Sequence, residues 1–422
     1  MKYTAPRGTH DVLPEDAPVW QALERTCRKI FELYNYKEIR TPVFEMTELF
    51  ARTIGESTDI VSKEMYTFTD RKGRSLTLRP EGTAPVVRAA LEGSLIGKDK
   101  FTKFYYFGPM FRYERPQAGR QRQFHQAGVE VFGSADPLLD IEVIALAEQI
   151  FSRLGLPDLE VNINSVGCKK CQPEYNKKLK AHFRTHLDDM CENCKQRYEK
   201  NILRVLDCKE TACQKFIEKA PAPIDSLCKE CKTHFDQVLK GLDEHKLVKY
   251  KINDRLVRGL DYYTGTTFEV VSKQLGAQNA VCGGGRYDDL VAELGGPSLP
   301  AVGFAIGLER LVEIIKSSVM IPRSKLGISL FVVTLGEAAR KFGFDLLLKA
   351  RKAGISSDMD YSGKDLKAQL KSADRVGANF ALIVGDNELK SGKALLKHMQ
   401  NASQEEIKCD AATIVGKLED LI

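Results

Sequence analysis

Arginines and polar side chains gather between residues 104 and 132, in the stretch FYYFGPMFRYERPQAGRQRQFHQAGVEVF. Its two ends read as strands, and Pro116 and Gly119 predict a turn in the basic segment between them. Alternation along the second strand places on one face the residues Gln126, Gly128, Glu130 and Phe132. The arginines beside this face are Arg112, Arg115, Arg120 and Arg122, with Glu114 as the one acid among them. A polar pocket with an arginine rim suited to phosphate fits these residues better than a solvated edge hairpin does.

A carboxylate and a hydroxyl group are predicted at the end of another strand. Residues 65–83 read as a hairpin, with MYTFTD, a Lys-Gly turn and then SLTLRPEGT. The second strand ends in Glu81, Gly82 and Thr83, where a fixed carboxylate and hydroxyl can bind an ammonium group. The same residues can cap the helix predicted for APVVRAALEG, and the two roles are compatible.

Three later segments have pocket-like composition. In NDRLVRGLDYYTGTTFEVV, Arg258 precedes Tyr262 and Tyr263, whose hydroxyl groups lie beside glycines that permit close approach. A strand, a glycine loop and the start of a helix are predicted for AVCGGGRYDDL. A glycine loop that enters a helix can bind an anion, and Tyr287 is a candidate pocket residue. AVGFAIGLERLVEII predicts a small-residue strand and an apolar helix with Arg310 in its first turn.

Eight of the eleven cysteines fall within residues 168–250, a charged segment that reads as an inserted helical domain. They are Cys168 and Cys171, Cys191 and Cys194, Cys208 and Cys213, and Cys228 and Cys231. CxxC pairs can direct two thiolates to one zinc ion, so the eight could form two four-thiolate sites, structural rather than catalytic. A set of reduced structural thiols is an equal alternative at this point.

The remaining patterns predict elements that position these groups. A helix is expected after Asp16, a candidate N-cap, and a short strand containing Pro42 follows it. Residues 137–154 predict another helix, and LEVNINSVG a strand. From residue 326 to residue 422 strands alternate with helices, which predicts a parallel or mixed α/β domain after the linker PRSKLG.

Composition limits the class of protein. At 422 residues the chain predicts two or three domains, and 43% hydrophobic and 28% charged residues fit a soluble enzyme. No apolar run approaches the roughly 18 residues of a membrane span. The start, MKYTAPRGTHDVLPEDAP, has no apolar signal core, so we expect a cytoplasmic protein without membrane contact. A net charge of +6 permits nucleic-acid binding only through local basic patches.

FRYERPQAGRQRQFHQAGVEVFG closely resembles motif 2 of the class II aminoacyl-tRNA synthetases, in its histidyl-tRNA synthetase form. LRPEGT and RGLDYYTGT resemble that family's segments for the substrate amino group and for histidine, and AVGFAIGLER resembles motif 3. The first helix and its proline-containing strand resemble motif 1, the family's dimer interface. The resemblance implies an ATP-dependent ligase that activates L-histidine as histidyl-adenylate and transfers it to the 3′-end of tRNA(His).

The implied fold is α+β. A class II antiparallel sheet flanked by helices would occupy residues 1–325, interrupted by the insertion at 168–250, and an anticodon-binding α/β domain would occupy residues 326–422. A homodimer is expected. Mg2+ should arrive with ATP, and structural zinc in the insertion stays open.

The resemblance and the chemistry of the substrates together imply roles for residues. Arg112 and Arg258 are expected at the α-phosphate of ATP, and Arg310 at its γ-phosphate. Glu114 and Arg120 would help to place ATP, Phe124 would stack on adenine, and Gln117 would contact the tRNA acceptor end. The histidine-binding set is expected to be Glu81, Gly82, Thr83, Arg112, Gln126, Glu130, Arg258, Tyr262, Tyr263 and Tyr287. Within it, Glu130 would accept the imidazole N–H while a tyrosine hydroxyl binds the other ring nitrogen.

Two other classes of protein remain as alternatives. One is a catalytically idle, synthetase-like regulatory subunit that senses histidine; the arginines and the roughly hundred residues after motif 3 count against it. The other is a zinc-dependent RNA-binding protein, which would leave the polar pocket unexplained.

Overall fold

The computed structural model describes residues 3–55, 58–117, 119–156, 159–272, 280–317 and 327–421. Contacts within the chain divide it into two compact units, Met1–Met320 and Ile321–Ile422. The expected linker PRSKLG, apart from Gly327, lies outside the described residues. Within the described ranges, no helix combines the length and the apolar character that a membrane crossing requires.

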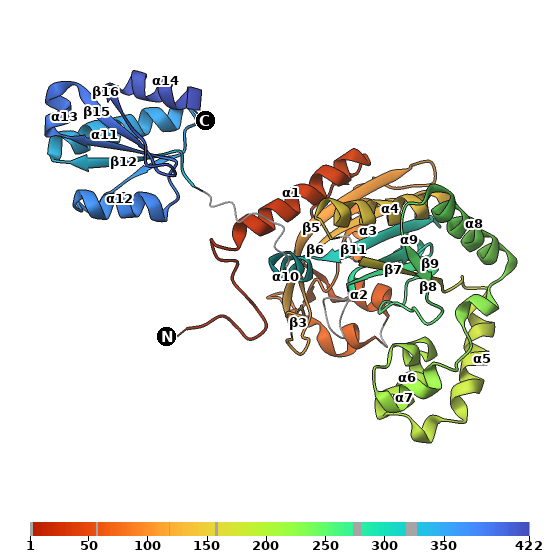
Figure 1. Ribbon diagram of the computed structural model, residues 1–422. Helices are drawn as coiled ribbons and strands as arrows, with labels where there is room; N and C mark the ends of the chain where they lie inside the picture. Colours follow the sequence, from red (N-terminus) through yellow and green to blue (C-terminus); the bar gives the residue numbers. More distant parts are fainter. Residues whose placement is uncertain are drawn as a thin grey trace. The chain divides into compact units, whose positions relative to one another are not determined.

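An eight-stranded sheet forms the centre of the first unit (Figure 1). In spatial order its strands are β1 (Lys37–Glu38), β5 (Thr102–Phe111), β6 (Gln123–Phe132), β11 (Ala301–Gly307), β10 (Ala280–Arg286), β9 (Thr264–Ser272), β7 (Leu159–Ser165) and β8 (Tyr250–Ile252). The outer pairs β1–β5 and β7–β8 are parallel, and the pairs between them are antiparallel. The predicted antiparallel sheet is therefore confirmed.

Helices cover the apolar face of this sheet. The helices of the unit outside its insertion are α1 (Ala17–Leu33), α2 (Thr47–Ile54), the π-helical turn η1 (Ile60–Glu64), α3 (Thr83–Glu92), α4 (Pro137–Arg153), α9 (Leu290–Glu293) and α10 (Leu308–Ser317). Helix α4 contacts β10 and β11, and α1 and α10 contact β6. On this side of β6, Ala127, Val129 and Val131 are fully buried. The opposite side of β6 carries Gln126 and Glu130 into a pocket, as the alternation in the sequence predicted.

The start of the chain differs from expectation in two details. Asp16 occupies the N-cap position of α1 but caps nothing with its side chain; its carboxylate instead pairs with Lys316 at 2.6 Å. The single strand expected around Pro42 is two short strands. Proline cannot donate to a ladder, and the chain leaves β1 there and joins a separate three-stranded sheet. That sheet has the order β2 (Phe44–Met46), β4 (Ser75–Leu78) and β3 (Tyr66–Thr69).

The segment between β7 and β8 is a helical insertion with its own core. Its elements are α5 (Gln172–Arg184), η2 (Leu187–Asp189), α6 (Glu192–Lys200), η3 (Ile202–Asp207), α7 (Thr211–Ile217), η4 (Pro223–Ser226) and α8 (Lys229–His245). Its buried centre includes Tyr175, Leu179 and Phe183 together with several of the cysteines. Figure 1 shows α5, α6 and α7 projecting from the body of the unit, whereas α8 packs on α4.

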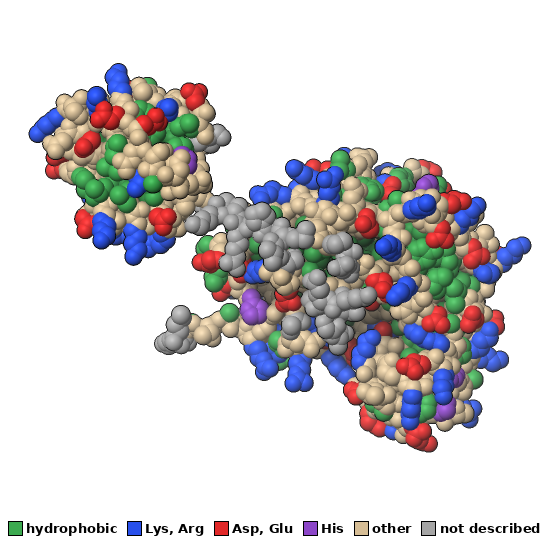
Figure 2. All heavy atoms as spheres, viewed as in Figure 1, with side chains coloured by type: hydrophobic (Ala, Val, Ile, Leu, Met, Phe, Trp, Pro, Cys, Tyr) green, Lys and Arg blue, Asp and Glu red, His purple; other side chains and the backbone are tan. Residues whose placement is uncertain are grey.

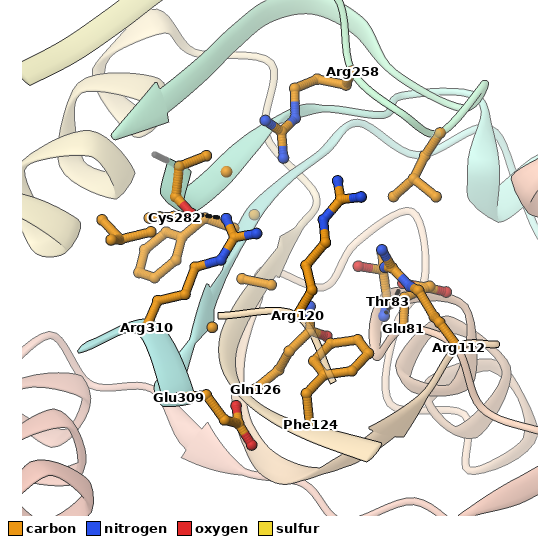
Figure 3. A pocket seen from close by; sticks show the side chains of 18 of the residues that line it. Glu81, Thr83, Arg112, Arg120, Phe124, Gln126, Arg258, Cys282, Glu309 and Arg310 are labelled. Carbon is orange, nitrogen blue, oxygen red and sulfur yellow. Dashed lines mark hydrogen bonds between the residues drawn. The ribbon is translucent and has the colours of Figure 1, made fainter. Parts of the chain in front are cut away.

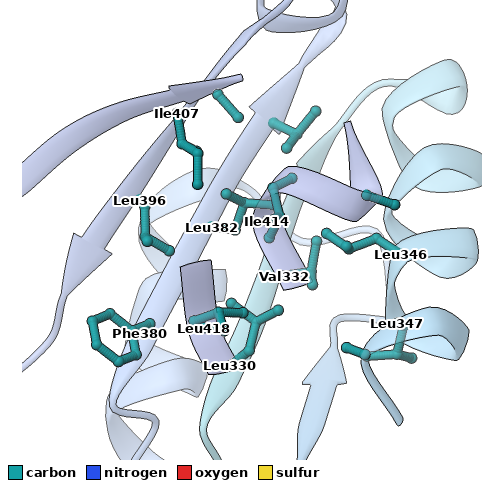
Figure 4. Close-up of a cluster of buried hydrophobic side chains, with 14 of the residues drawn as sticks. Leu330, Val332, Leu346, Leu347, Phe380, Leu382, Leu396, Ile407, Ile414 and Leu418 are labelled. Carbon is teal, nitrogen blue, oxygen red and sulfur yellow. The ribbon is translucent and has the colours of Figure 1, made fainter. Parts of the chain in front are cut away.

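The second unit has a mixed five-stranded sheet, as predicted. The strand order is β13 (Ser357–Met359), β12 (Leu330–Leu335), β14 (Phe380–Gly385), β15 (Lys393–His398) and β16 (Gln404–Lys408), and the helices are α11 (Glu337–Lys352), α12 (Leu366–Arg375), α13 (Asp386–Ser391) and α14 (Ala411–Leu421). Strands β13, β12 and β14 are parallel, and β15 and β16 are antiparallel to their neighbours. Figure 4 shows the core that α11 and α14 form with this sheet, where Leu346 and Ile414 are fully buried.

Charges are spread over the surface. On the face in Figure 2, Lys and Arg side chains are interspersed with Asp and Glu rather than gathered in one patch. This distribution agrees with the small net charge of +6.

A buried ion pair joins α4 to the end of β10. The side chains of Asp140 and Arg286 are 1% and 2% exposed, and Arg286 Nη2 lies 2.7 Å from Asp140 Oδ2. Nε2 of His234, in α8, lies 3.2 Å from Oδ1 of the same carboxylate. Burial alone would raise the pKa of Asp140, but His234 and Arg286 stabilise its charge and lower it. This cluster ties the last helix of the insertion to the central sheet.

We expect Arg286→Met to lower the free energy of unfolding of the first unit by about 3–5 kcal/mol, because it leaves a buried carboxylate without its main counter-charge. Urea unfolding followed by the fluorescence of Trp20, the chain's single tryptophan, would measure the loss. The matched control, Arg74→Met, removes an exposed pair with Asp70 and should barely move the midpoint. A loss no larger than the control's would contradict this account of the pair.

Candidate active site

A pocket lies on the face of the central sheet to which β6 presents Gln126 and Glu130 (Figure 3). Its volume is about 280 Å³, near the lower end of the range for small-molecule sites. Segments far apart in the sequence form its wall: the start of α3, the β5–β6 hairpin, the segment before β9, strands β10 and β11, and the start of α10. The antiparallel order of the sheet brings these segments together.

All but two of the predicted site residues line this pocket, and they are Glu81, Thr83, Arg112, Glu114, Arg120, Phe124, Gln126, Glu130, Arg258, Tyr262, Tyr263, Tyr287 and Arg310. Gly82 does not line it; a Cβ atom there would overlap the ring of Tyr106, so this glycine permits close packing. Gln117 lies in the β5–β6 loop, where its carbonyl accepts from the Arg120 N–H at 2.9 Å.

One end of the pocket is rich in guanidinium groups. Glu114 lies 3.1 Å from Arg120 Nε and 3.8 Å from Arg112 Nη1, so a single carboxylate serves two arginines. Arg112 also donates to the Pro80 carbonyl at 2.8 Å, and its guanidinium lies 5.3 Å from the centre of the Phe124 ring. These contacts fix both arginines and leave a net positive charge at this end.

Arg310 is held by carbonyl groups rather than by an acid. It donates from Nε to the Gly119 carbonyl at 3.0 Å and from Nη1 to the Ala280 carbonyl. No carboxylate of the described part of the chain lies within salt-bridge distance of it. Burial lowers the pKa of Arg310, and the neighbouring charge of Arg120 lowers it further. A half-buried guanidinium without a paired acid is suited to bind an anion.

Arg258 enters the pocket across the glycines of β10. Its Nη1 atom lies 2.6 Å from Glu269 Oε1. Burial opposes its charge, but Glu269 more than compensates, so the pKa of Arg258 is raised. A Cβ atom on Gly283 would overlap the Arg258 guanidinium in its present position, so this glycine leaves room for the arginine. The glycine loop predicted here is therefore wrong: Gly283 and the two glycines that follow it pair with β9 and β11 inside a strand.

The other end of the pocket closes on a buried carboxyl group. Glu130 is 1% exposed; its Oε1 atom accepts from the Thr83 hydroxyl at 2.7 Å, and its Oε2 atom accepts from the Tyr287 hydroxyl. Burial raises the pKa of Glu130 to about 8, although the hydrogen bonds from Tyr287 and Thr83 act in the opposite direction. This end therefore offers a titratable group ringed by hydroxyl donors.

Glu81 caps the N-terminus of α3 with its side chain. Its carboxylate accepts from the backbone N–H groups of Thr83 at 2.6 Å and Ala84 at 2.9 Å, so the capping role considered for it is confirmed. Burial raises its pKa. Thr83 does not cap with its side chain, because its hydroxyl donates to Glu130 instead.

Four polar atoms in the pocket wall lack a hydrogen-bond partner among the described residues, and they are Oε2 of Glu114, Oε1 of Gln121, Oε1 of Gln126 and Nε of Arg258. Because buried polar atoms are normally paired, a polar ligand could satisfy the Gln126 acceptor and the Arg258 donor.

Several pocket residues escaped the sequence analysis. Gly303 pairs with Glu130 across β11 and β6, and a Cβ atom on it would overlap that carboxylate, so it makes room for the buried acid. The period-two run of small residues in AVGFAIG, Gly303 and Ala305 included, was the available signal. Glu309 accepts from the His125 backbone N–H at 2.8 Å and carried no signal beyond its position before Arg310.

Outside the pocket, two groups of four cysteines in the insertion could each hold a metal ion. Their sulfur atoms all lie within 4.8 Å of one another in each group. None of these eight cysteines lines the pocket.

Comparisons with known proteins agree in every part of the chain. The family model for histidyl-tRNA synthetase matches residues 8–311, and the model for an anticodon binding domain matches residues 329–417. The chain is 52% identical to the histidine–tRNA ligase of Halothermothrix orenii over 423 residues, covering 100% of both chains. It is also 52% identical to that of Pelotomaculum thermopropionicum, over 97% of this chain and 96% of the relative. The crystal structure of apo S. aureus histidyl-tRNA synthetase superimposes with a TM-score of 0.83 at 39% identity, covering 99% of this chain and 100% of that one.

We expect Glu130→Gln to weaken the dependence of stability on pH. Folded Glu130 keeps its proton up to about pH 8, whereas the unfolded chain releases it near the ordinary value of 4.5. Between these values the unfolded state binds fewer protons, so this group makes the free energy of unfolding fall as pH rises. Between about pH 5 and about pH 8, the urea midpoint of the ligand-free wild type should therefore fall more steeply than that of Glu130→Gln.

Glu32→Gln, at an exposed position of α1, is the control and should follow the wild-type profile. A difference between Glu130→Gln and wild type that stays constant with pH would contradict the raised pKa.

Proposed function

The chain belongs to the histidyl-tRNA synthetase family, and we propose that its pocket activates L-histidine with ATP before the histidyl group passes to the 3′-end of tRNA(His). The observation that carries this assignment is the polarity of the pocket. A buried carboxyl group, Glu130, closes one end, and at the other end Arg112 and Arg120 share one acid while Arg310 is held by carbonyl groups. Such a site accommodates a small polar amino acid next to a polyphosphate.

Histidine would occupy the Glu130 end. Imidazole donates from one ring nitrogen and accepts at the other, which matches a carboxylate beside tyrosine hydroxyls. Glu130 would accept the ring N–H, and Tyr262, Tyr263 and Tyr287 would surround the ring. The unpartnered Gln126 Oε1 and Arg258 Nε would then bind the ammonium and carboxylate ends of the amino acid. Glu81, Gly82 and Thr83 would support the ammonium group.

ATP would occupy the arginine end. Arg112 and Arg258 would contact the α-phosphate, Arg310 the γ-phosphate, and Arg120 with Glu114 would place the nucleotide. Phe124 would stack on adenine. Each charge-assisted contact contributes about 1.5–3 kcal/mol.

The first step needs positioning more than a general base. The histidine carboxylate is already anionic, so it can attack the α-phosphorus directly, forming the C–O–P bond of the adenylate while pyrophosphate leaves. Arginines fixed by backbone carbonyls would stabilise the charge that develops on the phosphate oxygens. In the second step a 3′-terminal ribose hydroxyl of tRNA attacks the carbonyl carbon and AMP leaves.

Mg2+ would enter with ATP. The carboxylates that line the pocket all have partners within the chain, and they are Glu81, Glu114, Glu130 and Glu309. Most of their oxygens are engaged within the chain, so phosphate oxygens and water would supply most of the ion's ligands. Zinc at the cysteine clusters would belong to the fold rather than to this reaction, because none of those sulfurs lines the pocket.

The remaining partners follow from the family. The second unit would contact the anticodon, and Gln117 in the β5–β6 loop would contact the acceptor end. A homodimer would cover apolar side chains that are exposed around the motif 1 segment, among them Leu33, Phe44 and Met46. Reaction in the cytoplasm fits this set of partners.

Histidine-dependent ATP–pyrophosphate exchange tests the proposed function directly. Purified protein and a panel of amino acids should give exchange with histidine alone. Absence of exchange with every amino acid, from protein shown to be folded, would favour a histidine-sensing regulatory relative instead.

Two substitutions should separate the two ends of the pocket. Glu130→Gln should raise KM for histidine by about tenfold or more and change KM for ATP little, because it replaces one of the two acceptor oxygens at the imidazole end with an NH2 donor. Arg310→Lys should lower kcat/KM for ATP by about ten- to a hundredfold with little change in KM for histidine, since lysine lacks the bidentate fork. Each variant is the control for the other in the same exchange assay, and equal losses for both substrates would refute the assignment of the ends.

A further inference from the structure

The eight cysteines of the insertion form two separate clusters. The first cluster is Cys168, Cys171, Cys228 and Cys231, and the second cluster is Cys191, Cys194, Cys208 and Cys213. The first joins the start of the insertion to the start of α8, and the second lies wholly within the loop that the first closes. CxxC pairs thus meet partners that are distant in the sequence.

The sulfur spacing is that of a tetrahedral metal site. Zinc–sulfur bonds of about 2.3 Å place the sulfurs of a tetrahedron about 3.8 Å apart. The observed sulfur–sulfur distances are 3.7 Å for Cys168–Cys171, 4.0 Å for Cys168–Cys228 and 3.8 Å for Cys191–Cys208. A disulfide would bring two sulfurs to about 2.05 Å, and all eight cysteines are free.

Backbone N–H groups point at these sulfurs. Cys228 N donates to Cys171 Sγ at 3.0 Å, and Cys191 N donates to Cys213 Sγ at 3.3 Å. Glu210 N donates to Cys208 Sγ at 3.4 Å. Four thiolates at these distances repel one another unless a cation lies between them.

We propose that each cluster binds one Zn2+ ion through four thiolates. An all-sulfur tetrahedral set selects zinc or iron over Mg2+ and Ca2+. Neither ion would contact the substrates of the proposed reaction. The first site joins residues 60 positions apart, so it would lower the entropy lost in closing the insertion.

The second site is linked to the histidine end of the pocket. Between Cys194 and Cys208 the chain carries η3, and from this segment Asn201 Nδ2 donates to Asp261 Oδ1 at 3.0 Å. Arg204 Nε donates to the same oxygen at 3.3 Å, and its Nη2 donates to the Gly259 carbonyl. Residues 259–261 stand between Arg258 and Tyr262, two predicted ligands of histidine. The second zinc ion would therefore fix the segment that contains Asn201 and Arg204. Through their hydrogen bonds to residues 259–261, this segment positions Arg258 and Tyr262, and Asn201 is a positioning residue.

Elemental analysis of the full chain, purified without chelator and washed with a weak one, tests the sites. We expect two equivalents of zinc per chain. Well under one equivalent of any metal would overturn both sites, and iron in place of zinc would overturn the choice of metal. A single equivalent would overturn whichever site the variants below show to be empty.

Cys231→Ser and Cys213→Ser should each remove one equivalent, from the first and second sites respectively. Cys409→Ser, at a cysteine outside both clusters, is the matched control and should keep two. Where a serine variant does not fold, Co2+ exchanged into the wild-type chain should give thiolate charge-transfer and tetrahedral d–d absorption for two equivalents. Failure to develop these bands would overturn the four-thiolate geometry.

The link to histidine binding rests on the proposed function, whereas metal content does not, so the two can fail separately. Asn201→Ala should keep both zinc ions and raise KM for histidine by about two- to tenfold, with a smaller change in KM for ATP, which Arg112, Arg120 and Arg310 also bind in the proposed function. Lys200→Ala, an exposed neighbour, is the control. An unchanged KM for histidine in Asn201→Ala would overturn the positioning role while leaving the metal sites intact.

Discussion

A carboxyl group buried at the centre of the sheet imposes the first requirement on this fold. An isolated acid in such a place would be costly, so hydrogen-bond donors must surround it. Thr83 and Tyr287 supply hydroxyl groups to Glu130 from two different segments, and Gly303 on the neighbouring strand leaves the space that the carboxylate fills. Satisfying this one group therefore fixes the relative positions of the start of α3, strand β6, strand β11 and the turn after β10. The same arrangement makes a pocket that can distinguish a ligand by its hydrogen bonds rather than by its size alone.

The arginines of the pocket carry positive charge that must remain available to an anionic ligand. They must stay charged in a partly buried pocket without being neutralised by acids, because a neutralised arginine has less attraction for phosphate. Backbone carbonyls meet both needs: Arg310 rests on Gly119 and Ala280, and Arg112 on Pro80. Glu114 is shared between two guanidinium groups, and Arg258 has an acid of its own, Glu269. The pocket is thus preorganised for an anion at one end and for a neutral or cationic ring at the other.

The sequence predicted the strands and helices of the site well because their periodicities were strong. Alternation in β6 identified Gln126 and Glu130 as one face, and the small-residue strand before Arg310 is β11. The glycines of β10 were misassigned because glycine signals both a turn and a close approach, and only the structure brings Arg258 against Gly283. CxxC spacing identified pairs of thiols. Which pairs share a cluster depends on how the chain folds from α5 to α8, and local spacing does not predict that fold.

Strand β6 pairs with β11, which is synthesised much later. These central neighbours are joined in register from Gln126 with Gly307 to Phe132 with Ala301, so β11 leaves the ribosome about 170 residues after β6. At about 5–20 residues per second, one edge of the β5–β6 hairpin waits on the order of ten seconds or more without its neighbour. During that interval an apolar strand with unpaired backbone groups is open to other nascent chains. The late arrival of β11 therefore exposes the β6 edge to aggregation for as long as residues 133–300 take to translate.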